Sequence, residues 1–161
     1  MDSPSAVVYA GSFDPPTLGH IDVVRRASAV FGEVIVLVAE NMAKQGLFSV
    51  AERVELLQQE LRDLKNVQVD TCQGLVVDYC KKKGIRTLIR GIRSVSDYEY
   101  EASMGRLNAD LYSKIETLFF ISRKDYVHLK SEVVKEIARF GGDLSKMLPA
   151  RVEKKLKQKI S

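Results

Sequence analysis

The sequence contains no tryptophan, only two cysteines and no long apolar run. Cys72 and Cys80 have neither the spacing of a metal site nor enough partners for a disulfide framework, so we expect both to be reduced core residues of a cytoplasmic protein. No segment approaches the roughly 18 consecutive apolar residues of a membrane span. The first residues, MDSPSAVVYAG, lack the basic segment of a secretory signal. These absences argue against a secreted or membrane-spanning protein.

Charge of one sign is only in modest excess, with 25 Lys and Arg residues against 21 Asp and Glu residues and a net charge of +4. This balance favours anionic partners without selecting one. Much of the excess lies in ARVEKKLKQKIS, where Val152, Leu156 and Ile160 keep the apolar spacing of an amphipathic helix. The few aromatic residues do not alternate with basic ones, so we expect neither a nucleic-acid partner nor a membrane.

Short apolar runs alternate with segments of helical periodicity along the whole chain. The runs predict strands over residues 6–10, 34–39, 67–71, 86–89 and 117–121. The periodic segments predict helices over residues 18–31, 50–61, 75–83, 97–111 and 131–140, and a C-terminal helix over about 149–159. Ser49 to Glu52 matches a capping box, and Gly84 is placed to end the third helix.

Alternation of strands and helices is typical of an α/β fold. We predict one domain over residues 1–161, built on a Rossmann-like, doubly wound, five-stranded parallel sheet with helices on both faces. In the order 3-2-1-4-5, the first and fourth strands are neighbours at the topological switch point, where such sheets bind ligands. The loops after these two strands should therefore face one crevice.

The segment after the first predicted strand, GSFDPPTLGH, is suited to holding an anion. Gly11 allows a close approach of the backbone, and Pro15 and Pro16 stiffen the loop. His20 falls in the first turn of the next helix, where free N–H groups favour an anion and disfavour an imidazolium. An ordinary turn with a capping histidine explains this segment about equally well when it is considered alone.

The segment after the fourth predicted strand, IRGIRSVSDYEYE, carries two cations in apolar surroundings. Arg90 and Arg93 flank Gly91, and guanidinium groups match phosphate oxygens. The alternative is that both arginines form ion pairs with nearby acidic residues such as Asp97 and Glu101. No G-x-G-x-x-G or P-loop motif is present, so an NAD-type or P-loop site is not indicated. A loop suited to an anion and a loop with two cations, at neighbouring strand ends, together predict a polyphosphate site.

Four stretches carry a resemblance to a known family. Thr17-Leu18-Gly19-His20 is similar to the (H/T)xGH signature of the nucleotidyltransferases related to class I aminoacyl-tRNA synthetases. YAGSFDPPTLGHIDVVRRA, FSVAERVELL, TLIRGIRSVSDYEYE and SEVVKEIARFGGD, in this order and spacing, resemble the bacterial phosphopantetheine adenylyltransferases. The resemblance covers nearly the whole chain. The histidine motif alone indicates the superfamily, and its combination with IRGIR and DYEYE indicates the family.

The resemblance implies a reaction in which ATP and 4′-phosphopantetheine give dephospho-coenzyme A and pyrophosphate by direct in-line displacement, with Mg²⁺ assisting. The attacking phosphate is already an anion, so such a transfer requires no protein nucleophile and no base. The protein must position the substrates and neutralise charge. We therefore expect no metal ligands from protein side chains.

Family roles can be carried over position by position. The resemblance implies catalytic roles for His20, as the transition-state stabiliser, and for Lys44 and Arg93. It places ATP against Ser12, Phe13, His20, Gly91, Ile92, Arg93, Glu101, Tyr126, Val127, His128, Leu129, Lys130, Ser131 and Glu132. It places 4′-phosphopantetheine against Ser12, Lys44, Val76 and Arg90. Without the resemblance, Lys44 would be interpreted as an exposed loop lysine and Val76 as an apolar helix residue.

One stretch departs from the family pattern. Where the family usually carries isoleucine and three serines, this chain has Leu129, Lys130, Ser131 and Glu132. We expect Glu132 to point away from the phosphates as an early helix residue. The resemblance also implies a homohexamer, and it leaves open whether coenzyme A inhibits the protein.

Other functions remain open from the sequence. A related nucleotidyltransferase could act on nicotinamide mononucleotide, or on an alcohol phosphate with CTP, and would share His20 but differ at Lys44, Val76 and Arg90. A non-catalytic nucleotide- or RNA-binding module would not require His20. A regulated coenzyme A binder is the third alternative.

Overall fold

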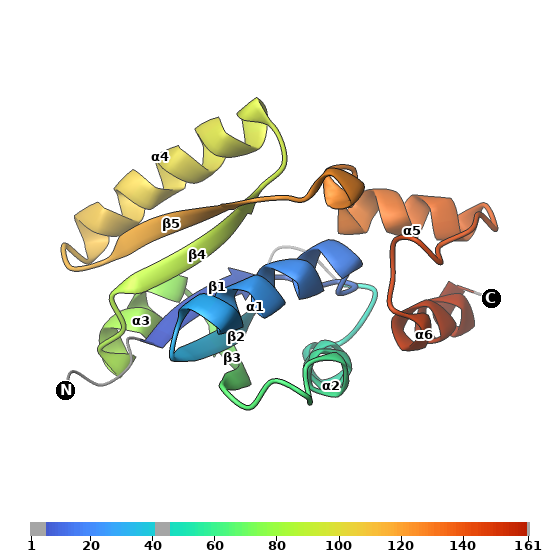
Figure 1. Cartoon of the computed structure of the whole chain (residues 1–161), viewed down its shortest axis with the longest axis horizontal. Coiled ribbons are helices and arrows are strands. Elements are labelled where there is room, and N and C mark those ends of the chain that lie inside the picture. Colours follow the sequence, from blue (N-terminus) through green and yellow to red (C-terminus); the bar gives the residue numbers. More distant parts are fainter. Residues whose placement is uncertain (1–5, 41–45, 161) are drawn as a thin grey trace.

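The computed structural model describes residues 6–40 and 46–160. Its centre is one parallel sheet in the order β3-β2-β1-β4-β5 (Figure 1). The strands are β1 (Ala6–Gly11), β2 (Glu33–Glu40), β3 (Val67–Gln73), β4 (Thr87–Ile92) and β5 (Glu116–Ile121). The predicted α/β class, strand order and neighbouring of the first and fourth strands are confirmed.

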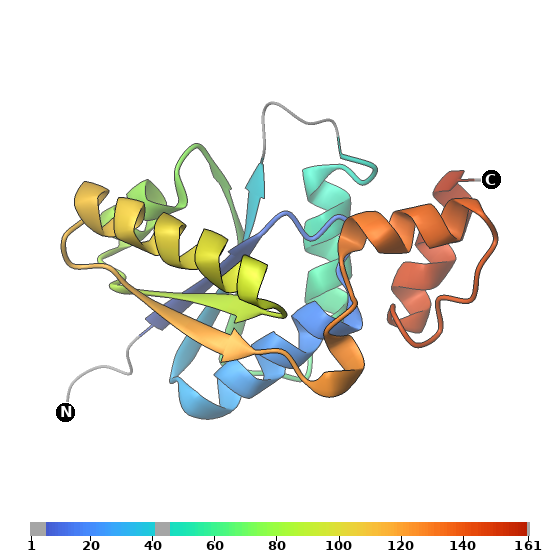
Figure 2. The same ribbon diagram turned by 90° about the horizontal axis from the view of Figure 1, so that it is seen from above.

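Helices cover both faces of the sheet, as predicted. They are α1 (Leu18–Val30), α2 (Val50–Glu60), α3 (Val76–Lys83), α4 (Val95–Leu111), α5 (Ser131–Arg139) and α6 (Ala150–Ile160), with a short 3₁₀ helix η1 (Lys124–Tyr126) that the sequence analysis missed. Helices α1 and α2 lie against one face, and α3 and α4 against the other (Figure 2). None of the described helices is long and apolar enough to cross a bilayer.

Alternate residues of the central strands supply the two cores. Val7 and Val36 pack with Val24 of α1 on one face, while Val8 and Leu37 pack on the other. Because both faces are covered, these strands are continuous apolar runs rather than alternating ones. Both cysteines are buried and free, as expected.

Local capping signals determine several helix boundaries. Ser49 Oγ accepts a hydrogen bond from the backbone N–H of Glu52, and the Glu52 carboxylate accepts one from the backbone N–H of Ser49, which confirms the capping box. Gly84 ends α3 with φ +70°, a conformation that a residue without a Cβ adopts at little cost.

The fourth strand is longer than its sequence pattern predicts. Arg90, Gly91 and Ile92 belong to β4 rather than to the loop after it, and they pair in register with the last residues of β5. The pattern stops at Ile89 because a charged residue interrupts the apolar run. The strand continues because the Arg90 guanidinium finds hydrogen-bond partners in the folded chain.

The C-terminal helices form a third core with α2. Phe48 and Leu56 pack there with Val134 of α5 and Leu156 of α6. Three ion pairs, Glu52–Lys159, Glu55–Lys155 and Glu60–Arg151, flank this core between α2 and α6. In Figure 1, α5 and α6 lie at the end of the molecule where β1 passes into α1. This packing brings the first turn of α5 to the carboxyl ends of the strands.

Candidate active site

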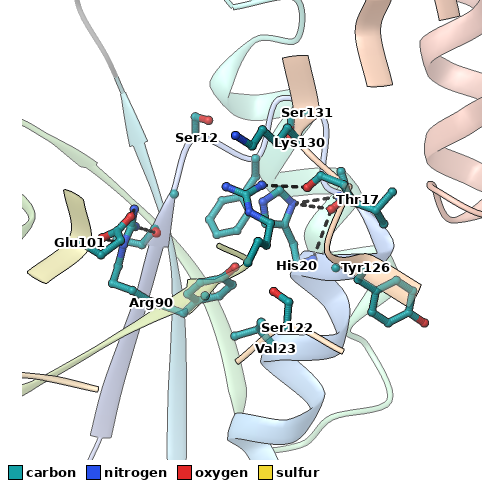
Figure 3. Close-up of a pocket in the computed structure, with 18 of the residues that line it drawn as sticks. Ser12, Thr17, His20, Val23, Arg90, Glu101, Ser122, Tyr126, Lys130 and Ser131 are labelled. Carbon is teal, nitrogen blue, oxygen red and sulfur yellow. Dashed lines mark hydrogen bonds and ion pairs between the residues drawn. The ribbon is translucent and has the colours of Figure 1, made fainter. Parts of the chain in front are cut away.

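A cavity of about 390 Å³ lies at the carboxyl ends of β1 and β4. Figure 3 shows His20 between two groups of side chains, with Arg90 and Glu101 on one side and Thr17 and Tyr126 on the other. The predicted site residues that line the cavity are Ser12, Phe13, His20, Arg90, Gly91, Arg93, Glu101, Tyr126, Leu129, Lys130, Ser131 and Glu132. The two loops that the sequence analysis singled out therefore meet in one crevice.

The position of His20 follows from the way α1 begins. Thr17 is the N-cap, and its Oγ1 accepts the backbone N–H of His20 at 3.3 Å. In return, the His20 Nδ1 accepts the backbone N–H of Thr17 at 3.0 Å. This is a capping box with histidine in place of the usual Glu or Gln. Because Nδ1 is an acceptor, the proton of the neutral imidazole is on Nε2, which remains available as a donor.

His20 is uncharged in the folded protein at neutral pH. Burial of the imidazole and, to a smaller extent, the positive charges of Arg93 and Arg90 lower the pKa of His20 to about 3. The dipole of α1 already favours a neutral imidazole at this position, as expected from the sequence. The structure adds two causes that involve residues far away in the chain.

The loop after β1 is shaped around the ring of Phe13. Phe13 is buried and has φ +50°, a left-handed conformation that costs a residue with a side chain on the order of 1 kcal/mol. Its ring makes edge-on contacts with Tyr9, at 5.4 Å between centroids, and with His20, at 5.0 Å. Gly11 leaves room for it, because a Cβ on Gly11 would lie 3.1 Å from the ring. Phe13 therefore packs edge-on against the imidazole and is itself one of the residues that line the cavity.

Hydrogen bonds to Glu101 and Ala10 hold the guanidinium group of Arg90 and do not use all of its N–H donors. Its Nε and one terminal nitrogen donate to the two carboxylate oxygens of Glu101 at 2.7 and 2.6 Å, and the other terminal nitrogen donates to the carbonyl of Ala10. A guanidinium has five N–H donors. Three are used by these described residues, so two remain for a ligand.

Arg93 connects the loop after β4 to the segment before α5, which forms another wall of the cavity. Its Nε donates to Asp97 at 2.8 Å, and a terminal nitrogen donates to the carbonyl of Leu129 at 2.9 Å. The ion-pair alternative for both arginines is thus part of the structure. It does not exclude ligand binding, because these contacts fix the guanidinium groups at the cavity and leave N–H donors unused.

The wall formed by residues 129–132 is the segment that departs from the family pattern. Lys130 precedes α5 as its N-cap residue and makes no side-chain capping bond. Ser131 Oγ donates to the carbonyl of Pro15 at 2.9 Å, which joins α5 to the loop after β1. Glu132 is exposed but lines the cavity, which differs from the expectation that it points away from the site.

Several predicted residues lie elsewhere. Ile92 is buried in the sheet, and Val127, His128 and Val76 do not line the cavity. Lys44 lies outside the described residues.

Some lining residues were missed by the sequence analysis. Tyr9 is one of them, and burial raises the pKa of its hydroxyl to about 12, so it stays protonated. Only the position of Tyr9 at the end of a central strand could have indicated it. Thr17, Gly19, Val23 and Ser122 also line the cavity.

A second cavity of about 690 Å³ adjoins the first. The two share Ser12, Ser131 and Glu132. The second extends to Arg53 and past the ends of β2 and β3. Ligands in the two cavities would meet at the shared residues.

Comparison with known proteins decides the family. The cytidylyltransferase-like family model matches residues 8–137. A phosphopantetheine adenylyltransferase of Dictyoglomus turgidum is 49% identical over 153 residues, which are 95% of this chain and 96% of that protein. The chain belongs to the phosphopantetheine adenylyltransferase family. A family member from Thermosynechococcus vestitus is 48% identical over 92% of this chain and 89% of its own length.

A solved structure supports the fold of this family member independently. A Vibrio parahaemolyticus protein, provisionally assigned as a nicotinate-nucleotide adenylyltransferase, aligns with a TM-score of 0.67 over 96% of this chain and 91% of its own. The two sequences are 16% identical, so this likeness establishes the shared fold and nothing about the substrate.

Proposed function

We propose that this chain transfers AMP from ATP to 4′-phosphopantetheine and releases pyrophosphate. The observation that carries the proposal is the convergence of a neutral imidazole donor and two arginine side chains on one cavity, within a family member. A phosphate oxygen of the acceptor attacks the α-phosphorus of ATP. The bond from that phosphorus to the bridging oxygen breaks, and its electrons leave with pyrophosphate. No protein nucleophile or base is needed.

The roles of the residues follow from their donors. His20 Nε2–H and the unused N–H groups of Arg93 stabilise the negative charge on the α-phosphoryl oxygens during transfer. A neutral donor suits this position because it binds the developing charge without holding the charged ground state equally tightly. Lys130 and Ser131, at the start of α5, contact the phosphates that leave.

The acceptor binds on the side where the two cavities meet. The two N–H donors of Arg90 that the described residues leave unused take the phosphate of 4′-phosphopantetheine in the first cavity, with Ser12, which lines both cavities, beside it. Lys44 assists from the segment between β2 and Gly46, and the pantetheine arm extends past the ends of β2 and β3 toward Val76.

Mg²⁺ enters this proposal with the nucleotide. Among the described residues, no group of three or more His, Cys, Asp or Glu side chains could hold a metal. Mg²⁺ commonly binds through substrate phosphates and waters, which suits a site lined by donors. When bound, the ion neutralises phosphate charge, and the side chains named above position the phosphates.

The experiment is a comparison of acceptors. Purified protein is incubated with ATP, Mg²⁺ and one of 4′-phosphopantetheine, nicotinamide mononucleotide or glycerol phosphate, and pyrophosphate release is followed. Of the three acceptors, we expect only 4′-phosphopantetheine to support pyrophosphate release. Dephospho-coenzyme A should form in the same reaction. Pantetheine, which lacks the attacking phosphate, is the matched control, and CTP in place of ATP tests the nucleotide. Release with another acceptor only would overturn the proposal.

We further propose a cytoplasmic homohexamer that also binds coenzyme A, whose structure contains the phosphopantetheine arm. Helix α4 has no buried residue, and Val95, Tyr100 and Leu111 are exposed apolar side chains on it. Such an apolar surface suits contact between copies of the chain. Sedimentation equilibrium tests the assembly, since a mass of 18.1 kDa would correspond to a single chain.

A further inference from the structure

A group of charged side chains lines the second cavity and has no role in the reaction as described so far. Asp14 is 6% exposed and Arg53 is 7% exposed. The carboxylate of Asp14 accepts the backbone N–H groups of Leu47 at 2.9 Å and Phe48 at 2.8 Å, and it pairs with Lys135 of α5 at 3.3 Å. Asp14 thereby connects three segments that are distant in the sequence.

Arg53 completes this group from α2. Its Nε donates to the carbonyl of Phe48 at 2.9 Å, and a terminal nitrogen donates to the carbonyl of Ser12 at 3.0 Å. The packing around it is close, because a Cβ on Gly46 would lie 2.9 Å from Arg53 and 3.2 Å from Asp14. We call Asp14, Arg53 and Lys135 the clamp.

The clamp holds the residues at which the two cavities meet. Ser12, Ser131 and Glu132 line both cavities. The clamp fixes Ser12 through its carbonyl, and it fixes α5 through Lys135, one helical turn after Ser131. Ser131 itself bonds to Pro15, the residue next to Asp14. The relative position of the two cavity walls therefore depends on the clamp.

We propose that Asp14, Arg53 and Lys135 are positioning residues for AMP transfer, which hold the wall at Ser12 and the first turn of α5 at the spacing that in-line attack requires. The inference rests on the proposed function. An in-line displacement is sensitive to small changes of distance, and a misplacement of about 1 Å can lower the rate about 100-fold. Buried ion pairs add little net stability compared with apolar packing, so stability alone does not account for the clamp.

The chain offers a matched control. Asp22 is 8% exposed and pairs with Arg26 and Arg123, and it lines neither cavity. Asp14→Asn and Asp22→Asn therefore remove the same charge from equally buried sites. We expect Asp14→Asn to lower kcat by about 10- to 100-fold with the KM for ATP changed less than about threefold. We expect Asp22→Asn to keep kcat within about threefold of the unmodified protein, although both variants lose stability.

Two variants of Lys135 separate an effect on the position of the cavity walls from an effect on folding stability. Lys135→Met and Lys135→Gln change a partly exposed side chain, and both variants can be compared even if Asp14→Asn does not fold. We expect each to lower kcat by about five- to tenfold at a temperature where circular dichroism shows it folded. Values of kcat that match Asp22→Asn, or losses that follow the unfolding midpoints of all variants, would overturn the clamp.

Hydrogen exchange tests the clamp without relying on turnover. In Asp14→Asn or Lys135→Met, we expect the amides of residues 11–14, 17 and 131–136 to exchange faster together, and in Asp22→Asn we expect none of these amides to change. If the unmodified protein releases no pyrophosphate with any acceptor, the proposed function fails, while coupled exchange would still support the clamp. Unchanged exchange in both clamp variants would refute it.

Discussion

The loops after β1 and β4 face the same cavity, but they are held in different ways. The first is fixed by its backbone, by the left-handed Phe13 and by the capping box of Thr17 and His20. The end of β4 and the loop after it are fixed by ion pairs, from Arg90 to Glu101 and from Arg93 to Asp97. The first loop presents an uncharged donor, and the second presents charge.

The two loops depend on each other because the charges presented by one affect the protonation of the other. The guanidinium groups of Arg93, in the loop after β4, and of Arg90, at the end of β4, help keep the imidazole of the first loop neutral. The neutral imidazole can in turn lie beside two cations without a repulsive charge. A site built from either loop alone would lack one of the two properties that phosphoryl transfer uses, which are accurate positioning and positive potential.

The largest effect is expected at His20, where two variants separate the capping of α1 from the proposed role of the imidazole in catalysis. We expect His20→Ala to lower kcat by roughly 10²–10³-fold while ATP still binds, as for loss of one transition-state donor. His20→Gln should lower kcat by a similar factor, because it also lacks the imidazole. Steady-state kinetics with both substrates measures these effects.

The two variants should differ in stability. Glutamine is a usual capping-box residue at this position, so His20→Gln keeps the bond to the Thr17 backbone that His20→Ala loses. We expect the unfolding midpoint of His20→Gln to lie above that of His20→Ala. Near-normal turnover in His20→Gln would remove the imidazole from the mechanism.

An intermediate effect is expected at the charged loop. We expect Arg90→Ala to raise the KM for 4′-phosphopantetheine by about 10- to 100-fold and the KM for ATP by less than about threefold, since one charged hydrogen-bonding group is lost on the acceptor side. Arg90→Lys keeps the charge but not the fork that bonds both oxygens of Glu101, so it is the matched control. Equal losses for both substrates would contradict the assignment.

The smallest expected effect is the pH dependence of folding stability that comes from His20. The pKa of His20 is about 3 in the folded protein and about 6.5 in the unfolded chain, so between these two pH values the unfolded chain binds this proton and the folded protein does not. Stability from this group is therefore present above pH 6.5 and is lost as pH falls toward 3. Between pH 7 and pH 6 we expect the folding equilibrium constant of the unmodified protein to fall about threefold more than that of His20→Gln.

Urea unfolding at the two pH values measures this difference, and carboxylates common to both proteins cancel. An equal fall in both proteins would mean that His20 titrates normally in the folded state, and the neutral role proposed for it would then be wrong.

Much of the fold could be predicted from the sequence, because the signals involved are local. Apolar runs and helical spacing predicted the strands and helices, and the Ser49 capping box and Gly84 predicted helix ends correctly. These features depend on residues within a few positions of each other. Ser12, His20, Arg90 and Arg93 line one cavity because the carboxyl ends of neighbouring parallel strands lie together.

The pattern of residues along the chain predicts the elements, the sheet and the edge at which chemistry can occur. Contacts in the folded protein place Arg90 inside a strand beside Glu101, bring the charges of Arg93 and Arg90 to bear on His20, and join Asp14 to Lys135 across 121 positions of the chain. The physical reason is that periodicity and capping act between near neighbours along the backbone. Burial, charge and ion pairing act through space, and they depend on contacts that exist only once the chain has folded.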